Sequence, residues 1–189
     1  MQELRHFEFS GVEIEKRDMN EPKIIGYAAV FNQLSEKLGW FREKIQPGAF
    51  TESILNDDIR ALFNHDTSFV LGRNKASTLV LSEDDRGLKI EIIPPSTTWA
   101  SDFMVSLQRG DINQMSFGFM TLSDSWETIE GEEVRTLKKA KLVEVSPVTF
   151  PAYPQTEVAL RSKERWSGAI KPEAELWKAS FRKRQIDLI

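Results

Sequence analysis

The chain has 189 residues and a net charge of −4, and 40% of its residues are hydrophobic, which is enough apolar material for one domain with its own core. It contains no cysteine, so disulfides, thiolate catalysis and cysteine zinc sites are excluded. No segment approaches the ~18 apolar residues of a membrane helix, and the first residues lack the pattern of a signal peptide. We therefore expect a soluble intracellular protein that does not bind membranes.

Charge is distributed unevenly along the chain. Residues 161–189 carry 8 Lys or Arg and 4 Asp or Glu, whereas residues 1–160 carry 17 and 25. This difference predicts a domain over residues 1–160 and a basic, partly helical tail over residues 161–189. The acidic body argues against nucleic-acid binding. The tail is either a solvated segment or a contact for the body, a scaffold or another acidic partner.

The first half of the chain predicts short strands separated by turns. Residues 26–31 and 41–45 have the composition of strands, and Pro47-Gly48 ends the second of them. Residues 49–55 predict a short helix, and residues 59–65 predict a strand that ends at His65.

The second half predicts two hairpins around one helix. Residues 79–81 and 88–93 form the first hairpin, with a turn at residues 84–87. Apolar residues at every fourth position from Trp99 to Leu107 predict a helix, capped by Ser96 or Thr97 and ended at Gly110. Residues 114–122 and 137–150 are predicted strands, with a turn at residues 130–132 between them. Strands outnumber helices, so the pattern predicts a mixed β fold with α, mainly an antiparallel β-barrel surrounded by a few helices.

The predicted strand at residues 114–122 presents a serine beside a glycine. Met115, Phe117 and Phe119 share one face, and Ser116 and Gly118 share the other. The apolar face belongs in the core, so we expect Ser116 to point away from the core. Gly118 would then let a substrate backbone approach closely. The alternative is an ordinary serine on a solvent-facing strand surface.

His65 is one of only two histidines in the chain. With Ser116 it has the residue types of a nucleophile and its general base, because an imidazole titrates near neutral pH. On a strand it would share a face with Ala61 and Phe63, and the alternative is a histidine packed at the rim of the core. The other histidine, His6, lies in a polar N-terminal segment and carries little weight as a catalytic group.

Glu144 is the candidate for the group that orients His65. It lies in the β-branched run 142–148, where a charge is costly unless it is paired. Ser146 shares its face and is the alternative for this role, and an ion pair with Lys or Arg would make Glu144 purely structural. Two distant histidines make a poor metal set, and the chain has no Gly-rich phosphate loop, so no metal or cofactor is expected. Arg73 and Arg109 lie in turn-like segments, where surface salt bridges are favoured over substrate contacts.

Short motifs recur along the chain in a specific order: Gly26-Tyr27-Ala28-Ala29-Val30-Phe31, Pro47-Gly48-Ala49-Phe50, Ala61-Leu62-Phe63-Asn64-His65-Asp66, Leu71-Gly72-Arg73, Asp85-Arg86-Gly87-Leu88, Arg109-Gly110-Asp111-Ile112, Met115-Ser116-Phe117-Gly118-Phe119 and Glu144-Val145-Ser146-Pro147-Val148-Thr149-Phe150-Pro151-Ala152-Tyr153-Pro154. As an ordered set over residues 7–160, they resemble the tailed-phage prohead (capsid maturation) protease family, which is related in fold to the herpesvirus maturation protease, assemblin. Each motif alone is weak, and the ordered set is what carries the resemblance.

The resemblance implies a herpesvirus-protease-like fold and a serine endopeptidase. The family's histidine falls on His65 and its nucleophile on Ser116. Assemblin-type enzymes use a second histidine as the third member, but no histidine follows Ser116 in this chain. Glu144 is therefore our candidate for the third member, and the oxyanion hole stays unassigned.

The resemblance also implies partners and a place of action. Family members work in the host cytoplasm inside the immature capsid, where they cut the scaffolding segment from the major capsid protein and degrade themselves without a cofactor. Assemblin relatives are dimers, so a homodimer is one state that the resemblance allows. Two alternatives stay open. One is a small-substrate serine esterase or amidase, although the chain has no Gly-x-Ser-x-Gly elbow. The other is a non-catalytic capsid assembly or scaffold protein on the same fold.

Overall fold

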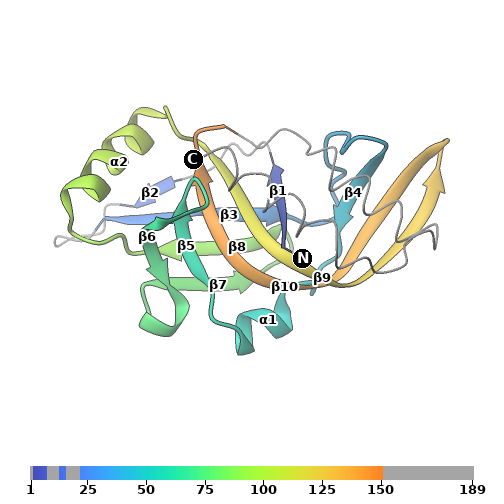
Figure 1. Cartoon of the computed structure of the whole chain (residues 1–189), viewed down its shortest axis with the longest axis horizontal. Helices are drawn as coiled ribbons and strands as arrows, with labels where there is room; N and C mark the ends of the chain where they lie inside the picture. The colour runs from blue at the N-terminus through green and yellow to red at the C-terminus, as the bar shows by residue number, and fades with distance from the viewer. Residues whose placement is uncertain (1, 8–12, 16–21, 151–189) are drawn as a thin grey trace, which may run out of the picture. The chain divides into compact units, whose positions relative to one another are not determined.

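Figure 1 shows a computed structural model of the chain, which describes residues 2–7, 13–15 and 22–150. The predicted tail over residues 161–189 lies outside the described residues. The elements in chain order are β1 (Glu3–Phe7), β2 (Glu13–Glu15), β3 (Lys23–Val30), β4 (Phe41–Ile45), α1 (Thr51–Asn56), β5 (Arg60–Phe63), β6 (Asp66–Arg73), the 3-10 helix η1 (Asn74–Ala76), β7 (Leu79–Glu83), β8 (Gly87–Ile92), α2 (Thr98–Arg109), β9 (Gln114–Ile129) and β10 (Glu132–Val148). Within these residues, no helix combines the length and the apolar character needed to span a membrane.

The strands form two sheets. The first has the order β1-β9-β10-β5-β6, with β4 also paired to β10, and the second has the order β2-β3-β8-β7. The long strands β9 and β10 curve together through the first sheet, as the yellow and orange ribbons of Figure 1 show. Register shifts in their ladder, such as the one between Leu142 and Glu144, are β-bulges that increase this curvature. The first sheet is therefore curled into a half-barrel.

Strand β10 also pairs in parallel with two short strands. β4 pairs with residues 133–137 and β5 with residues 144–145. Between these segments, α1 and the residues before it take over the hydrogen bonding. The Ala140 amide donates to the Ala49 carbonyl at 2.9 Å, and the Leu142 amide donates to the Ser53 hydroxyl at 2.8 Å. Satisfying these buried amides keeps β10 continuous beside β5.

Apolar side chains from both sheets and from α2 form one core. Phe50, which precedes α1, meets Phe117 of β9 edge to face with ring centroids 5.4 Å apart. The buried face of α2 consists of Ala100, Phe103, Met104 and Leu107. This confirms the predicted helix, which ends at Gly110 with φ 80°. Ile24 of β3 and Ile90 of β8 bring the second sheet into the same core.

The predicted β-rich, mainly antiparallel fold with few helices is confirmed, but the described residues form a curled half-barrel and a second sheet rather than a closed barrel, and β10 makes two parallel pairs. The parallel pairs of β10 arise because the chain passes through α1 between β4 and β5 and returns in the same direction. Two local predictions were also wrong. β5 ends at Phe63, before the histidine, and the segment Leu71-Gly72-Arg73 belongs to β6 rather than to a turn.

Candidate active site

His65 lies in the two-residue turn between β5 and β6, not on a strand. Asn64 and His65 have φ angles of 52° and 60°, and Phe63 pairs with Asp66 across the turn. Asparagine tolerates this left-handed region better than most residues, which explains why β5 stops here. The expectation that His65 shares a strand face with Ala61 is therefore wrong.

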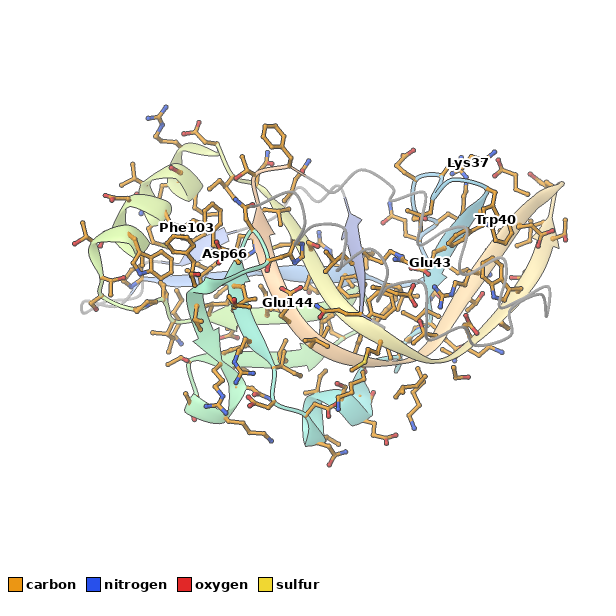
Figure 2. The ribbon with its side chains drawn as sticks, viewed as in Figure 1. Lys37, Trp40, Glu43, Asp66, Phe103 and Glu144 are labelled. Carbon is orange, nitrogen blue, oxygen red and sulfur yellow. The ribbon has the colours of Figure 1, made fainter. Side chains whose placement is uncertain are left out.

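Glu144 is the partner of the imidazole. Its Oε1 atom lies 2.7 Å from His65 Nδ1, and its side chain is 5% exposed. Its Oε2 atom accepts a hydrogen bond of 2.5 Å from the Ser146 hydroxyl. Figure 2 shows Glu144 on β10 near the turn that precedes Asp66. A carboxylate oxygen accepts, so this contact is a hydrogen bond in the tautomer with the ring proton on Nδ1, and that tautomer leaves Nε2 as the basic atom of the ring. The buried charge is thus paired with His65 and Ser146 rather than with Lys or Arg.

Gly118 makes room for this carboxylate. Gly118 and Glu144 are direct partners in the β9–β10 ladder. A Cβ atom on Gly118 would lie 2.5 Å from Glu144 Oε1 and 3.2 Å from Leu4 Cδ2, and it would also clash with the Gln2 amide. The expectation that Gly118 leaves space for a substrate backbone is therefore wrong. Side chains of the protein itself fill that space.

Ser116 faces away from Met115, Phe117 and Phe119, which are all in the core as predicted. It is nevertheless 0% exposed, so the alternative of an ordinary serine on a solvent-facing strand surface is wrong. The reason is β1, which pairs with β9 and was not predicted from the sequence. The Ser116 hydroxyl donates to the Arg5 carbonyl at 2.9 Å rather than to His65.

Strand register brings the candidate residues together. Ser116 lies opposite Ser146 in the β9–β10 ladder, two positions from the pair formed by Gly118 and Glu144. Residues two apart share a face, so Ser116 lies on the face that carries the carboxylate. On the other side of β9, the backbone of His6 is the partner of Ser116.

Comparison with known proteins shows the family of the chain. Residues 10–168 match a family model described as Caudovirus prohead serine protease. The chain belongs to this family. It is 32% identical over 137 residues to the prohead protease of Enterobacteria phage HK97, and the match covers 71% of the chain and 57% of that relative. The chain thus spans less than two thirds of the relative's length. The family resemblance predicted from the ordered motifs is confirmed.

A similar fold is found in a solved structure. The chain is similar to the bacteriophage T4 capsid assembly protease, with a TM-score of 0.53 and 11% sequence identity. The match covers 79% of this chain and 98% of that one. At this identity the likeness supports the β-rich fold and carries no information about individual side chains.

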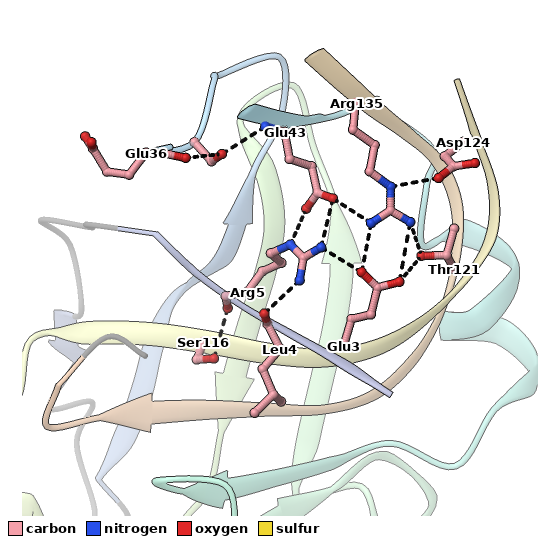
Figure 3. Close-up of polar contacts among 10 residues, drawn as sticks. Glu3, Leu4, Arg5, Glu36, Glu43, Ser116, Thr121, Asp124 and Arg135 are labelled. Carbon is pink, nitrogen blue, oxygen red and sulfur yellow. Dashed lines mark hydrogen bonds and ion pairs between the residues drawn. The ribbon is translucent and has the colours of Figure 1, made fainter. Parts of the chain in front are cut away.

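A buried charge cluster of Glu3, Arg5, Glu43 and Arg135 anchors β1 in this family member (Figure 3). Arg5 Nε lies 2.6 Å from Glu43 Oε1, and Arg135 Nη1 lies 2.8 Å from Glu3 Oε2 and 3.0 Å from Glu43 Oε2. Burial alone would raise the pKa of Glu3. The hydrogen bond and charge of Arg135, the charge of Arg5 and the Thr121 hydroxyl instead lower it to about 2. No sequence motif had indicated this cluster, because its members lie far apart in the chain.

The remaining candidate residues are structural. Arg73 Nη2 lies 2.6 Å from Asp58 Oδ2, and Arg109 Nε lies 3.1 Å from Asp111 Oδ2, both on the surface. The predicted salt bridges of these two arginines are confirmed. In the ranges that the structure describes, no three His, Asp or Glu side chains gather in a way that could hold a metal ion.

Proposed function

We propose that this chain is a serine endopeptidase of phage head maturation, with the scaffolding segment of the major capsid protein and the chain itself as substrates. Membership of the caudovirus prohead serine protease family supports the reaction class. The observation that carries the assignment is the contact of 2.7 Å between His65 and Glu144. Glu144 and Ser116 lie on the same face of the β9–β10 pair. Ser116 is paired with Ser146, two positions from the pair of Gly118 and Glu144.

The proposed mechanism is acyl transfer. Ser116 first exchanges its hydrogen bond to the Arg5 carbonyl for one to His65. Its Oγ atom then attacks the peptide carbonyl carbon while Nε2 of His65 takes the hydroxyl proton, and Glu144 stabilises the imidazolium that forms. As the C–N bond breaks, the same proton passes to the leaving amine. Water, activated by His65, hydrolyses the acyl-enzyme and regenerates Ser116.

We also infer the setting of this reaction. We propose that the β fold is related to the herpesvirus maturation protease, and that the chain acts in the host cytoplasm inside the immature capsid. The acyl-transfer mechanism needs no cofactor, since every proton transfer is assigned to a side chain or to water. We include in this proposal that the chain forms a homodimer, as assemblin does.

The test is co-expression with the major capsid protein of the same phage, followed by intact mass of both proteins. We expect the capsid protein to be shortened by the wild-type chain and to stay intact with Ser116→Ala or His65→Ala. The matched control is Ser53→Ala. Ser53 is also a buried serine bonded to β10, through the Leu142 amide at 2.8 Å, and this variant should still cleave. Cleavage by both Ser116→Ala and His65→Ala would overturn the mechanism.

Two further assays, ester hydrolysis and head formation, separate the two alternatives. A small-substrate esterase would hydrolyse p-nitrophenyl esters and leave the capsid protein intact. A non-catalytic assembly protein would support head formation equally well as wild type and as Ser116→Ala. We expect neither result.

A further inference from the structure

The turn that carries His65 has a histidine at a position where its backbone conformation favours glycine. Two consecutive positive φ angles, 52° at Asn64 and 60° at His65, are the signature of a type I′ hairpin turn, whose second position strongly favours glycine. A residue with a Cβ atom in this region costs on the order of 1 kcal/mol. Neighbouring structure must therefore hold the histidine in this conformation.

Asn64 makes three hydrogen bonds that hold the turn in this conformation. Its backbone amide donates to the Pro147 carbonyl at 3.0 Å. Its Nδ2 atom donates to Thr149 Oγ1 at 3.1 Å, and its Oδ1 atom accepts from the Thr149 amide at 2.8 Å. All three bonds reach Pro147 or Thr149, at the end of β10 and just beyond it, and β10 is the strand that carries Glu144.

These bonds extend the contact between β5 and β10 beyond the ladder. The two strands pair only at Arg60 with Glu144 and at Ala61 with Val145. Pro147 has no amide hydrogen to donate, so the strand pairing cannot continue through it in the ordinary way. The Asn64 side chain therefore joins the turn to β10 on the far side of that proline.

We propose that Asn64 is a positioning residue that holds the His65 imidazole against Glu144. The effect of Asn64 on catalysis rests on the proposed function. Its effect on the contact between His65 and Glu144 rests on the geometry alone. The competing explanation is that Asn64 is present only because asparagine tolerates a positive φ. Glycine would then serve equally well, because it adopts this conformation without strain.

Three variants distinguish these explanations. Asn64→Gly keeps the backbone freedom and the amide bond to Pro147 but removes both side-chain bonds to Thr149. Asn64→Asp keeps the acceptor for the Thr149 amide and replaces the Nδ2 donor by an oxygen that can accept from the Thr149 hydroxyl. The matched control is Asn74→Ala. Asn74 also joins two segments, accepting from the Ile59 amide at 3.0 Å and donating to the Asp57 carbonyl at 2.9 Å, but at the opposite end of β5.

The experiment uses the full chain labelled with ¹⁵N-histidine. There are only two histidines, so His6→Gln assigns the His65 signals. We expect the wild-type His65 Nδ1 proton to exchange slowly with water, and to exchange fast or broaden in Asn64→Gly. Capsid-protein cleavage by Asn64→Gly should fall about 10- to 100-fold in kcat with KM unchanged. Asn64→Asp should restore the signal and most of the rate.

Asn74→Ala should lower the thermal midpoint at least as much as Asn64→Gly while leaving the His65 signal and the cleavage rate unchanged. A wild-type signal and rate in Asn64→Gly would overturn the inference, as would equal losses of rate in Asn64→Gly and Asn74→Ala. A wild-type chain that shows the protected proton but cleaves nothing would instead contradict the proposed function, while the proton signal would still test the role of Asn64.

Discussion

The imidazole of His65 and the carboxylate of Glu144 meet at 2.7 Å although they are 79 positions apart in the chain. They meet because β5 runs parallel to β10 and the turn after β5 reaches back over Glu144. A buried carboxylate is stable only when its oxygens are hydrogen-bonded. Here one oxygen bonds His65 and the other accepts from Ser146. Both oxygens of Glu144 are therefore hydrogen-bonded, and one of them holds the imidazole of His65 in place.

Glu144→Gln should preserve the shape of the site and remove its charge. The amide cannot stabilise the imidazolium, and it can also hold the wrong tautomer of His65 by donating to Nδ1. We expect cleavage of the capsid protein, followed by intact mass, to slow by on the order of 100-fold or more. The control Glu127→Gln removes a half-exposed carboxylate from β9, where it pairs with Lys44 at 2.9 Å, and should cleave at the wild-type rate. A normal rate in Glu144→Gln would remove Glu144 from the mechanism.

Ser146→Ala should slow the reaction less. The change leaves Oε2 of Glu144 without its hydrogen bond while His65 stays bound to Oε1, so we expect a decrease of about 10-fold. A fluorophosphonate probe, with peptide mapping of the labelled protein, tests which serine is the nucleophile. We expect label on Ser116 in both the wild type and Ser146→Ala. Label on Ser146 in the wild type would exchange the roles of the two serines.

Gly118→Ala should displace the carboxylate. The added Cβ atom would lie 2.5 Å from Glu144 Oε1, so Glu144 has to turn away from His65, at a cost of about 1–3 kcal/mol in stability. We expect cleavage to fall as far as in Glu144→Ala. The double variant should be no slower than either single variant, because both remove the same contact. Independent, multiplying losses in the double variant would show that Gly118 acts elsewhere.

Local patterns predicted α2 and much of β9 and β10, because the signals of these elements lie within a few residues. Period-four apolar spacing located α2, and the alternation around Ser116 correctly separated the core face of β9 from the other face. His65 was misplaced because the tendency of Asn64 to adopt a positive φ ended the strand two residues early. That turn, rather than a strand face, is what directs the imidazole to Glu144.

The burial of Ser116 beneath β1 could not be predicted from the same local patterns. It depends on β1, a five-residue strand with a polar composition and no alternation strong enough to predict it. Glu3 and Arg5 are buried only because Glu43 and Arg135, which lie on β4 and β10, neutralise them. Long-range pairing of this kind leaves no periodic signal in the sequence.

The buried charge of Glu3 should make the protein sensitive to acid. Against the effect of burial, the hydrogen bond and charge of Arg135 and the charge of Arg5 lower the pKa of Glu3 in the folded chain from its ordinary value of 4.5 to about 2. A lowered carboxyl pKa stabilises the fold fully above about pH 4.5, and this contribution is lost as the pH falls towards 2. The shift corresponds to about 3 kcal/mol. We expect the free energy of unfolding of the wild type to fall steeply across this range, whereas Glu3→Gln should start lower at pH 6 and fall by about 3 kcal/mol less.

Urea unfolding followed by tryptophan fluorescence at pH 6, 4.5, 3.5 and 2.5 measures this difference. Thr121→Val is the informative companion variant, because it keeps the Glu3 carboxylate but removes the hydroxyl that donates to its Oε1 atom at 2.6 Å. Loss of that bond raises the pKa of Glu3, so the acid-sensitive range should move to higher pH. If the wild type and Glu3→Gln lose stability in parallel between pH 4.5 and 2.5, the ion pair with Arg135 is not what stabilises β1.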